Sequence, residues 1–139
     1  MGQRYLPGDE TWYASDAPVG SYSVVFEDDG ETGYFYAVER RGDDMRILDA
    51  VQIYAVRNVV DREIPSHLEV VWTGDGQHAA LYLNDYPHAV FDFEARRGYC
   101  RTGFPPPPQT GWSSQGHAWE ERALTPFGQA DAEPGGSGT

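Results

Sequence analysis

The chain has 139 residues, of which 40% are hydrophobic and 14% aromatic. This length suits one ordinary domain, and the apolar content is enough to offset the entropy of ordering most of the chain, which excludes global disorder. Asp and Glu number 22 against 10 Lys and Arg, so the formal net charge is −12. Because such a charge repels phosphate backbones and anionic lipid, we expect neither nucleic acid nor a membrane as a partner.

Cysteine usage and the N-terminus indicate the compartment. The single cysteine, Cys100, has no partner for an intramolecular disulfide, so the fold depends on packing and fits a reducing compartment. All the basic residues are arginine, which suggests a GC-rich bacterial genome. No apolar run reaches the length of about 18 residues that indicates a membrane span, and residues 1–10 contain Pro, Gly, Asp and Glu where a signal peptide needs an apolar core. The sequence therefore predicts a cytoplasmic bacterial protein.

Both ends of the chain differ in composition from its middle. Residues 1–20 mix Gly, Pro, Asp and Ser with scattered aromatics, so we expect an extended lead-in without regular structure. Residues 128–139 carry no large apolar side chain and are rich in glycine, which predicts a disordered tail. A single β-rich domain is expected over residues 21–127.

Alternation of apolar and polar residues predicts strands in the first half of this domain. Residues 22–26 and 34–39 alternate on either side of the Asp28-Asp29-Gly30 break, which is a hairpin signal because glycine adopts the tight turn at no steric cost. Residues 47–60 fit both a helical stripe and a strand. Their β-branched content favours a strand over residues 51–56.

The clearest pattern is a three-stranded antiparallel meander. Strands are expected at residues 67–72, 79–83 and 86–93, with a glycine turn before the second and a two-residue turn before the third. Alternation sorts the side chains of the last strand onto two faces. One face holds Ala89, Phe91 and Phe93, and the other holds His88, Val90 and Asp92.

The last part of the domain changes character after this meander. Four consecutive prolines at 105–108 end the sheet and impose an extended polyproline segment, and one short helix is expected around residues 118–124. Together the elements predict a β-rich α+β domain. We expect an antiparallel sheet of five or six strands, built from hairpins and a meander, with the short helix and the proline-rich segment packed across one face.

Part of the sequence resembles a family of small bacterial proteins catalogued as a domain of unknown function. The resemblance is carried within residues 70–107 by the segments DYPHAVFDF and RGYCR, and upstream by DAVQIYAV at residues 49–56. It implies a single bacterial domain, and it assigns no catalytic or binding position.

Cys100 is the candidate nucleophile. It lies among arginines, whose charges favour the thiolate form of a cysteine, and His88 is a candidate base with Asp92 as its orienting partner. The alternative is a packed, inert thiol, since cysteine is among the most buried residue types. Moreover, His88 and Asp92 are four positions apart on one strand, roughly 13 Å by the strand rise, so the histidine needs a different partner.

Other residues are candidates for binding a ligand or a partner. They are Asp92, Arg97, Tyr99, Arg101, Trp112 and Trp119. The arginines could hold an anion, or could pair with neighbouring carboxylates. The tryptophans could line a groove, or could cover the open face of the sheet.

We expect no metal site and no cofactor. The histidines, at 67, 78, 88 and 117, do not sit at spacings that place two ligands around one ion. The glycine turns lack the terminal glutamate of a calcium loop, and no cofactor-binding motif is present.

These features favour a non-catalytic binding protein. One version is an acidic inhibitor or immunity-type protein that neutralises a basic protein partner, because complementary charge speeds association. The alternatives are a small cysteine-dependent enzyme that uses Cys100, and a small-ligand module in which Arg97 or Arg101 anchors the ligand. Hydrophobic edge strands can pair between copies, so the sequence also allows a homodimer.

Overall fold

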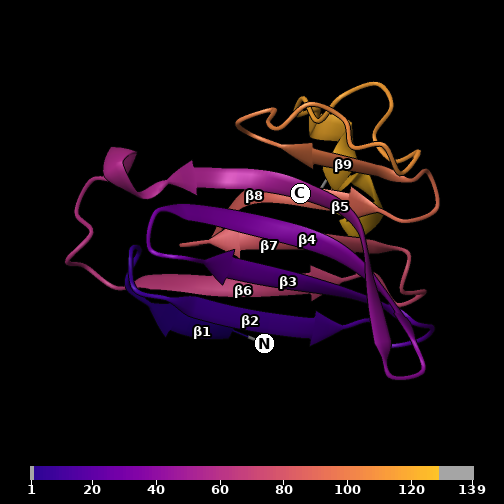
Figure 1. The fold of residues 1–139 in the computed structure, drawn as a ribbon, viewed down its shortest axis with the longest axis horizontal. Helices are drawn as coiled ribbons and strands as arrows, with labels where there is room; N and C mark the ends of the chain where they lie inside the picture. The colour runs from indigo at the N-terminus through magenta and orange to yellow at the C-terminus, as the bar shows by residue number, and fades with distance from the viewer. Residues whose placement is uncertain (1, 129–139) are drawn as a thin grey trace.

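The computed structural model describes residues 2–128, which form nine strands in two antiparallel sheets (Figure 1). One sheet has five strands in the order β1-β6-β7-β8-β9, and the other has four in the order β2-β3-β4-β5. The β-rich, antiparallel prediction is confirmed, whereas the expectation of one sheet of five or six strands was wrong. The strands divide because the apolar face of one sheet must be covered by another layer.

The four-stranded sheet is formed by the first half of the chain after β1. Its strands are β2 (Thr11–Asp16), β3 (Tyr22–Asp28), β4 (Thr32–Arg41) and β5 (Asp44–Ala55). The predicted hairpin is β3 with β4, and the ambiguous region after residue 47 enters β5 as a strand. A short 3-10 helix, η1 (Val56–Asn58), follows β5.

The five-stranded sheet contains the predicted meander. Its strands are β1 (Gly2–Tyr5), β6 (Ser66–Trp72), β7 (His78–Leu83), β8 (Tyr86–Asp92) and β9 (Arg97–Cys100). The meander is β6-β7-β8, as expected, and β9 extends it by one strand.

The N-terminal 20 residues were predicted to lack regular structure, and this was wrong. They contain β1 and β2, each of which forms an edge of a different sheet. Tyr13 of β2 packs against the core, and the Trp72 indole donates a hydrogen bond of 3.0 Å to the Ser15 hydroxyl. Backbone pairing with a distant strand therefore orders a segment whose own composition favours turns. Of the predicted disordered tail, residues 129–139 lie outside the described residues.

The core lies between the two sheets. Phe35 of β4 and Phe91 of β8 have no exposed surface, and their rings stack at 5.2 Å across the interface. Ala89, Phe91 and Phe93 all belong to this core, as the alternation predicted. Val90 belongs to a second cluster on the outer face of the five-stranded sheet.

The proline-rich segment closes one side of the sandwich instead of packing across a face as predicted. The Gln52 amide of β5 donates to the Phe104 carbonyl at 2.8 Å, and the Thr110 hydroxyl donates to the Leu48 carbonyl at 2.8 Å. At the other sheet, the Cys100 amide of β9 donates to the His117 carbonyl at 2.9 Å. The segment therefore bridges β5 and β9, which is where the orange chain lies in Figure 1.

A second 3-10 helix, η2 (Glu121–Phe127), covers the outer face of the five-stranded sheet. Its buried Ala123 packs with Ala80, Val90 and Tyr99. This element is the short helix predicted around residues 118–124, placed three residues later. Among the described residues, no helix has the length and apolar character needed to cross a membrane.

Candidate functional site

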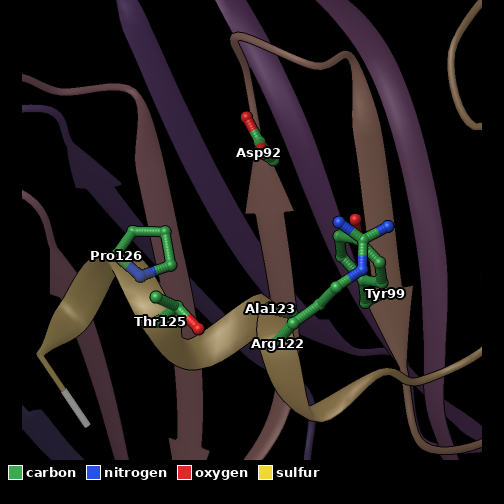
Figure 2. A pocket seen from close by; sticks show the side chains of 6 residues that line it. All are labelled: Asp92, Tyr99, Arg122, Ala123, Thr125 and Pro126. Atoms are coloured by element: carbon green, nitrogen blue, oxygen red, sulfur yellow. The ribbon is translucent and has the colours of Figure 1, made fainter. Parts of the chain in front are cut away.

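Half of the predicted binding residues meet on the outer face of the five-stranded sheet. A hollow of about 360 Å³ lies there between η2 and the ends of β8 and β9. Figure 2 shows the six side chains that line it. The hollow is lined by Asp92, Tyr99, Arg122, Ala123, Thr125 and Pro126. A neighbouring hollow of about 250 Å³ shares Asp92, Tyr99 and Arg122 with it and also contains Arg97. The structure thus brings the predicted residues Asp92, Arg97 and Tyr99 together.

The arginines of this face have partners within the chain. Arg97 lies over the Tyr99 ring, with 4.5 Å from its Cζ atom to the centroid, and pairs with the Glu120 carboxylate at 3.2 Å. Glu120 also accepts a hydrogen bond from Arg122, and this bond is the main cause that lowers the pKa of Glu120. The hollows are therefore lined by ion pairs.

The remaining predicted binding residues lie elsewhere. Arg101 lies between the rings of Trp119, at 3.9 Å, and Tyr86, at 4.6 Å, and its guanidinium pairs with Glu121 at 3.3 Å. Trp112 is only 5% exposed and packs in the core. Arg101 and Trp119 thus form a stack held within the chain, and Trp112 does not line a surface groove.

Cys100 and His88 are not brought together. The Cys100 thiol has no exposed surface, and its sulfur lies 3.4 Å from the Thr102 hydroxyl and 3.5 Å from the Phe104 carbonyl. His88 lies edge-on to Tyr86, and burial, helped by the charge of Arg101, lowers its pKa to about 4. Among the described residues, no hydrogen bond joins the thiol to a histidine side chain. The geometry is that of a packed thiol.

Burial of the thiol leads to a testable expectation. In the folded protein at pH 7, iodoacetamide should leave Cys100 unmodified, because the sulfur has no exposed surface for the reagent to reach. In denaturant the thiol should react at the rate of a free cysteine. Mass spectrometry of the native and unfolded chain measures both rates. Rapid modification of the native protein would contradict this structure and favour the cysteine-dependent enzyme.

A buried polar cluster that sequence reasoning missed joins β5 to the segment before η2. The His117 and Asp49 side chains have no exposed surface, and the His117 Nε2 lies 2.9 Å and 3.0 Å from the two Asp49 carboxylate oxygens. The other ring nitrogen, Nδ1, lies 2.6 Å from the Pro105 carbonyl. Because both ring nitrogens face acceptors, the arrangement fits a doubly protonated imidazolium. The sequence signal that could have indicated this cluster is Asp49, an acidic residue among the apolar residues of β5.

This cluster contains Ser, Asp and His but is not arranged for nucleophilic catalysis. The Ser113 hydroxyl donates to Asp49 at 2.6 Å and accepts the Gly98 amide at 2.7 Å. A serine nucleophile needs a histidine base within hydrogen-bond reach, and here the carboxylate separates the two. The cluster therefore links the sheets to the C-terminal segment through buried hydrogen bonds.

The buried His117–Asp49 pair predicts that the stability of the fold depends on pH. Burial lowers the pKa of His117, but the hydrogen bonds to Asp49 and Pro105 and the Asp49 charge outweigh it, so the pKa is raised overall. The folded chain then holds a proton that the unfolded chain releases above about pH 6.5, so the stabilisation is complete below that pH and is lost as pH rises through the folded pKa. Urea unfolding from pH 5.5 to 9 should show the gap between wild type and His117→Gln narrowing as pH rises. A difference in the free energy of unfolding that stays constant with pH would contradict the raised pKa of His117. The lowered pKa of His88 affects wild type and variant equally, so its effect on stability cancels in this difference.

The outer face of the four-stranded sheet carries an apolar groove. Trp12 of β2, which is 61% exposed, and Met45 and Ile47 of β5, both 57% exposed, line a groove of about 240 Å³. The nearly fully buried Val25 and Val38 also line it, and Tyr36 and Glu27 complete the lining. The Tyr36 hydroxyl donates to Glu27 at 3.0 Å. Large exposed apolar residues grouped in this way are typical of interaction surfaces.

An acidic hollow adjoins this groove where β2 begins and β3 ends. It is lined by Glu10, Thr11, Trp12, Glu27, Asp28 and Asp29. Trp12 and Glu27 belong to both the hollow and the groove. Asp28 is buried and accepts hydrogen bonds from Tyr54 and the Gly8 amide, whereas Glu10 and Asp29 are exposed. We call the groove and the hollow together the Trp12 face. Sequence patterns did not indicate this face, because Trp12 lies in the segment that was predicted to be an irregular lead-in.

Comparisons with known proteins identify a family to which this sequence is similar. A family described as "Uncharacterized protein conserved in bacteria (DUF2251)" matches residues 5–128. A Haemophilus influenzae relative, described as "Uncharacterized protein", is 40% identical over 106 residues, which cover 71% of this chain and 66% of that protein. The match thus spans slightly less than two thirds of the relative's length. No solved structure matches.

Proposed function

The chain belongs to the DUF2251 family of bacterial proteins, and we propose that it is a non-catalytic binding protein that docks a basic protein partner on the Trp12 face. The observation that carries this proposal is the continuity of an apolar groove with an acidic hollow through one exposed tryptophan. Interfaces combine such an aromatic anchor with a polar rim.

The negative charge of the chain favours a basic protein as the partner on the Trp12 face. The net charge of −12 makes a second copy of the chain an unfavourable occupant, because like charges repel. A basic partner can place apolar side chains against Met45 and Ile47 and an arginine or lysine beside Glu10 and Asp29. The same cation could lie over the Trp12 ring, which adds a cation–π attraction.

The state of Cys100 supports a non-catalytic role. An enzyme built on this thiol needs the sulfur exposed beside a base. Here the sulfur is buried and contacts a hydroxyl and a backbone carbonyl. The cysteine-dependent enzyme therefore draws no support from the site geometry.

The test compares two isoleucines of equal exposure. Ile47 lies on the Trp12 face, Ile64 lies in the loop after η1, and both are 57% exposed. The full chain and its Trp12→Ser, Ile47→Ser and Ile64→Ser variants are immobilised and challenged with bacterial lysate at low and high ionic strength. We expect wild type and Ile64→Ser to retain a basic protein, and this protein to elute as the salt concentration rises. Its affinity should fall at least about tenfold with Trp12→Ser and with Ile47→Ser.

Two outcomes would overturn the proposal. The first is retention of the partner that does not change with ionic strength. The second is an equal loss of retention in Ile64→Ser and Ile47→Ser, which would show that the Trp12 face is not the docking surface. Sedimentation analysis provides a further check. Dimerisation of the wild type that Ile47→Ser abolishes would make a second copy the occupant instead of a basic partner.

A further inference from the structure

Three residues with metal-ligating side chains gather on the outer face of the five-stranded sheet. His78 of β7 pairs directly with Asp92 of β8 across the ladder, and Glu94 follows two residues after Asp92. One donor atom from each of the three lies within 4.8 Å of the others. The cluster is independent of the Trp12 face, which belongs to the other sheet.

The surroundings of the His78 ring are not those of a hydrogen-bonded histidine. The ring nitrogen that faces the Asp92 carboxylate is Nε2, whereas Nδ1 is buried and has no hydrogen-bond partner among the described residues. The Nε2 atom lies 3.3 Å from the Asp92 carboxylate, longer than the usual N–H···O range of about 2.7–3.2 Å. Two ligands bound to one tetrahedral Zn²⁺ at about 2.0–2.2 Å are themselves about 3.3–3.5 Å apart. The observed separation of 3.3 Å falls in this range, so one ion can bind both side chains.

We propose that His78, Asp92 and Glu94 bind one divalent transition-metal ion of the Zn²⁺ type, with water in the remaining positions. An imidazole with two carboxylates suits such ions, whereas Mg²⁺ and Ca²⁺ prefer ligand sets made of oxygen alone. Asp92 also lines the adjoining hollow, which is open to water (Figure 2).

The fold holds two of the ligands and leaves the third free to move. Strand pairing positions His78 and Asp92, the Ala95 amide donates to the Asp92 carboxylate at 2.9 Å, and Phe127 of η2 lies edge-on to the His78 ring. Glu94 is exposed, so its side chain can turn toward the ion. A rigid pair with one adjustable ligand is a workable site for a metal that is bound from solution.

The local charge attracts a cation. With neutral His78, Asp92 and Glu94 contribute two negative charges. Arg97 faces Asp92 across β8 and β9, and Arg122 also lines the hollow, but both arginines pair with Glu120. Asp92 thus remains available as a ligand.

Calorimetric titration of the metal-free full chain with ZnCl₂ tests the proposal. Wild type should bind one equivalent. His78→Ala and the nearly isosteric Asp92→Asn should weaken binding at least about tenfold, whereas His67→Ala, which removes an exposed histidine on the neighbouring strand β6, should leave it unchanged. MgCl₂ should give no comparable binding.

Spectroscopy identifies the ligand directly. In a ¹⁵N–¹H spectrum of the imidazole groups, Zn²⁺ should shift the His78 ring signals and leave those of His67 in place. Far-UV circular dichroism establishes that each variant is folded, and Asp92→Asn provides the test if His78→Ala does not fold. Equal Zn²⁺ affinity in wild type and Asp92→Asn, an unmoved His78 signal, or equal binding of Mg²⁺ would overturn the proposal. None of these results bears on the Trp12 face.

Discussion

Replacing Asp49 by alanine is expected to lower the free energy of unfolding by about 3–5 kcal/mol at pH 6. The His117 and Asp49 side chains are fully buried, and the carboxylate accepts hydrogen bonds from the Ser113 hydroxyl and the Ala50 amide as well as facing the imidazole. Its removal leaves a buried positive charge without a counterion and a buried hydroxyl without an acceptor. Urea unfolding followed by circular dichroism measures the loss.

An exposed ion pair provides the control for this variant. Arg41 is 64% exposed and lies 3.3 Å from the Glu39 carboxylate, so Arg41→Ala should cost about 1 kcal/mol or less. Equal losses for the two variants would show that the Asp49 cluster does not stabilise the fold as a buried charge pair.

Truncation of Phe91 to alanine should destabilise the protein by about 3–5 kcal/mol. This ring has no exposed surface, stacks on Phe35 of the opposite sheet at 5.2 Å, and meets Trp112 edge-on at 6.4 Å. The deletion therefore leaves a cavity where the two sheets and the C-terminal segment meet. Chemical denaturation gives the free energy, and thermal unfolding gives the matching fall in Tm.

Ile64→Ala is the reference for this variant, since it removes an apolar side chain that is 57% exposed. We expect a change within about 0.5 kcal/mol for it. A loss for Phe91→Ala no larger than that of Ile64→Ala would mean that the contact between the sheets adds little to stability.

Local sequence patterns correctly predicted the strands and turns of the middle of the chain. The hairpin around residues 28–30, the strand after residue 50 and the three-stranded meander all follow from period-two alternation broken by turn residues. The same alternation correctly placed Phe91 in the core and Val90 on the other face. These features depend on neighbours in sequence.

A register shift between β7 and β8 is a feature that alternation along the chain does not predict. The two-residue turn pairs Leu83 with Tyr86 and Tyr82 with Pro87, and continuing this register would set His78 opposite Phe91. An extra residue in β8, His88, shifts the ladder by one and sets His78 opposite Asp92. A search for ligand spacings along the chain could not find this pair, because a bulge depends on how two strands fit.

Local sequence patterns were sufficient to predict the β-rich class, the positions of the central strands and the core face of the last meander strand, which holds Ala89, Phe91 and Phe93. The division of the strands into two sheets, with the N-terminal segment supplying an edge strand to each, became visible only in the folded chain. The tertiary structure also decided that Asp49 meets His117 across 68 positions of chain and that Trp12 borders both a groove and an acidic hollow. Backbone preference and alternation act over a few residues, whereas strand pairing and burial depend on which distant segments the folded sheets bring together.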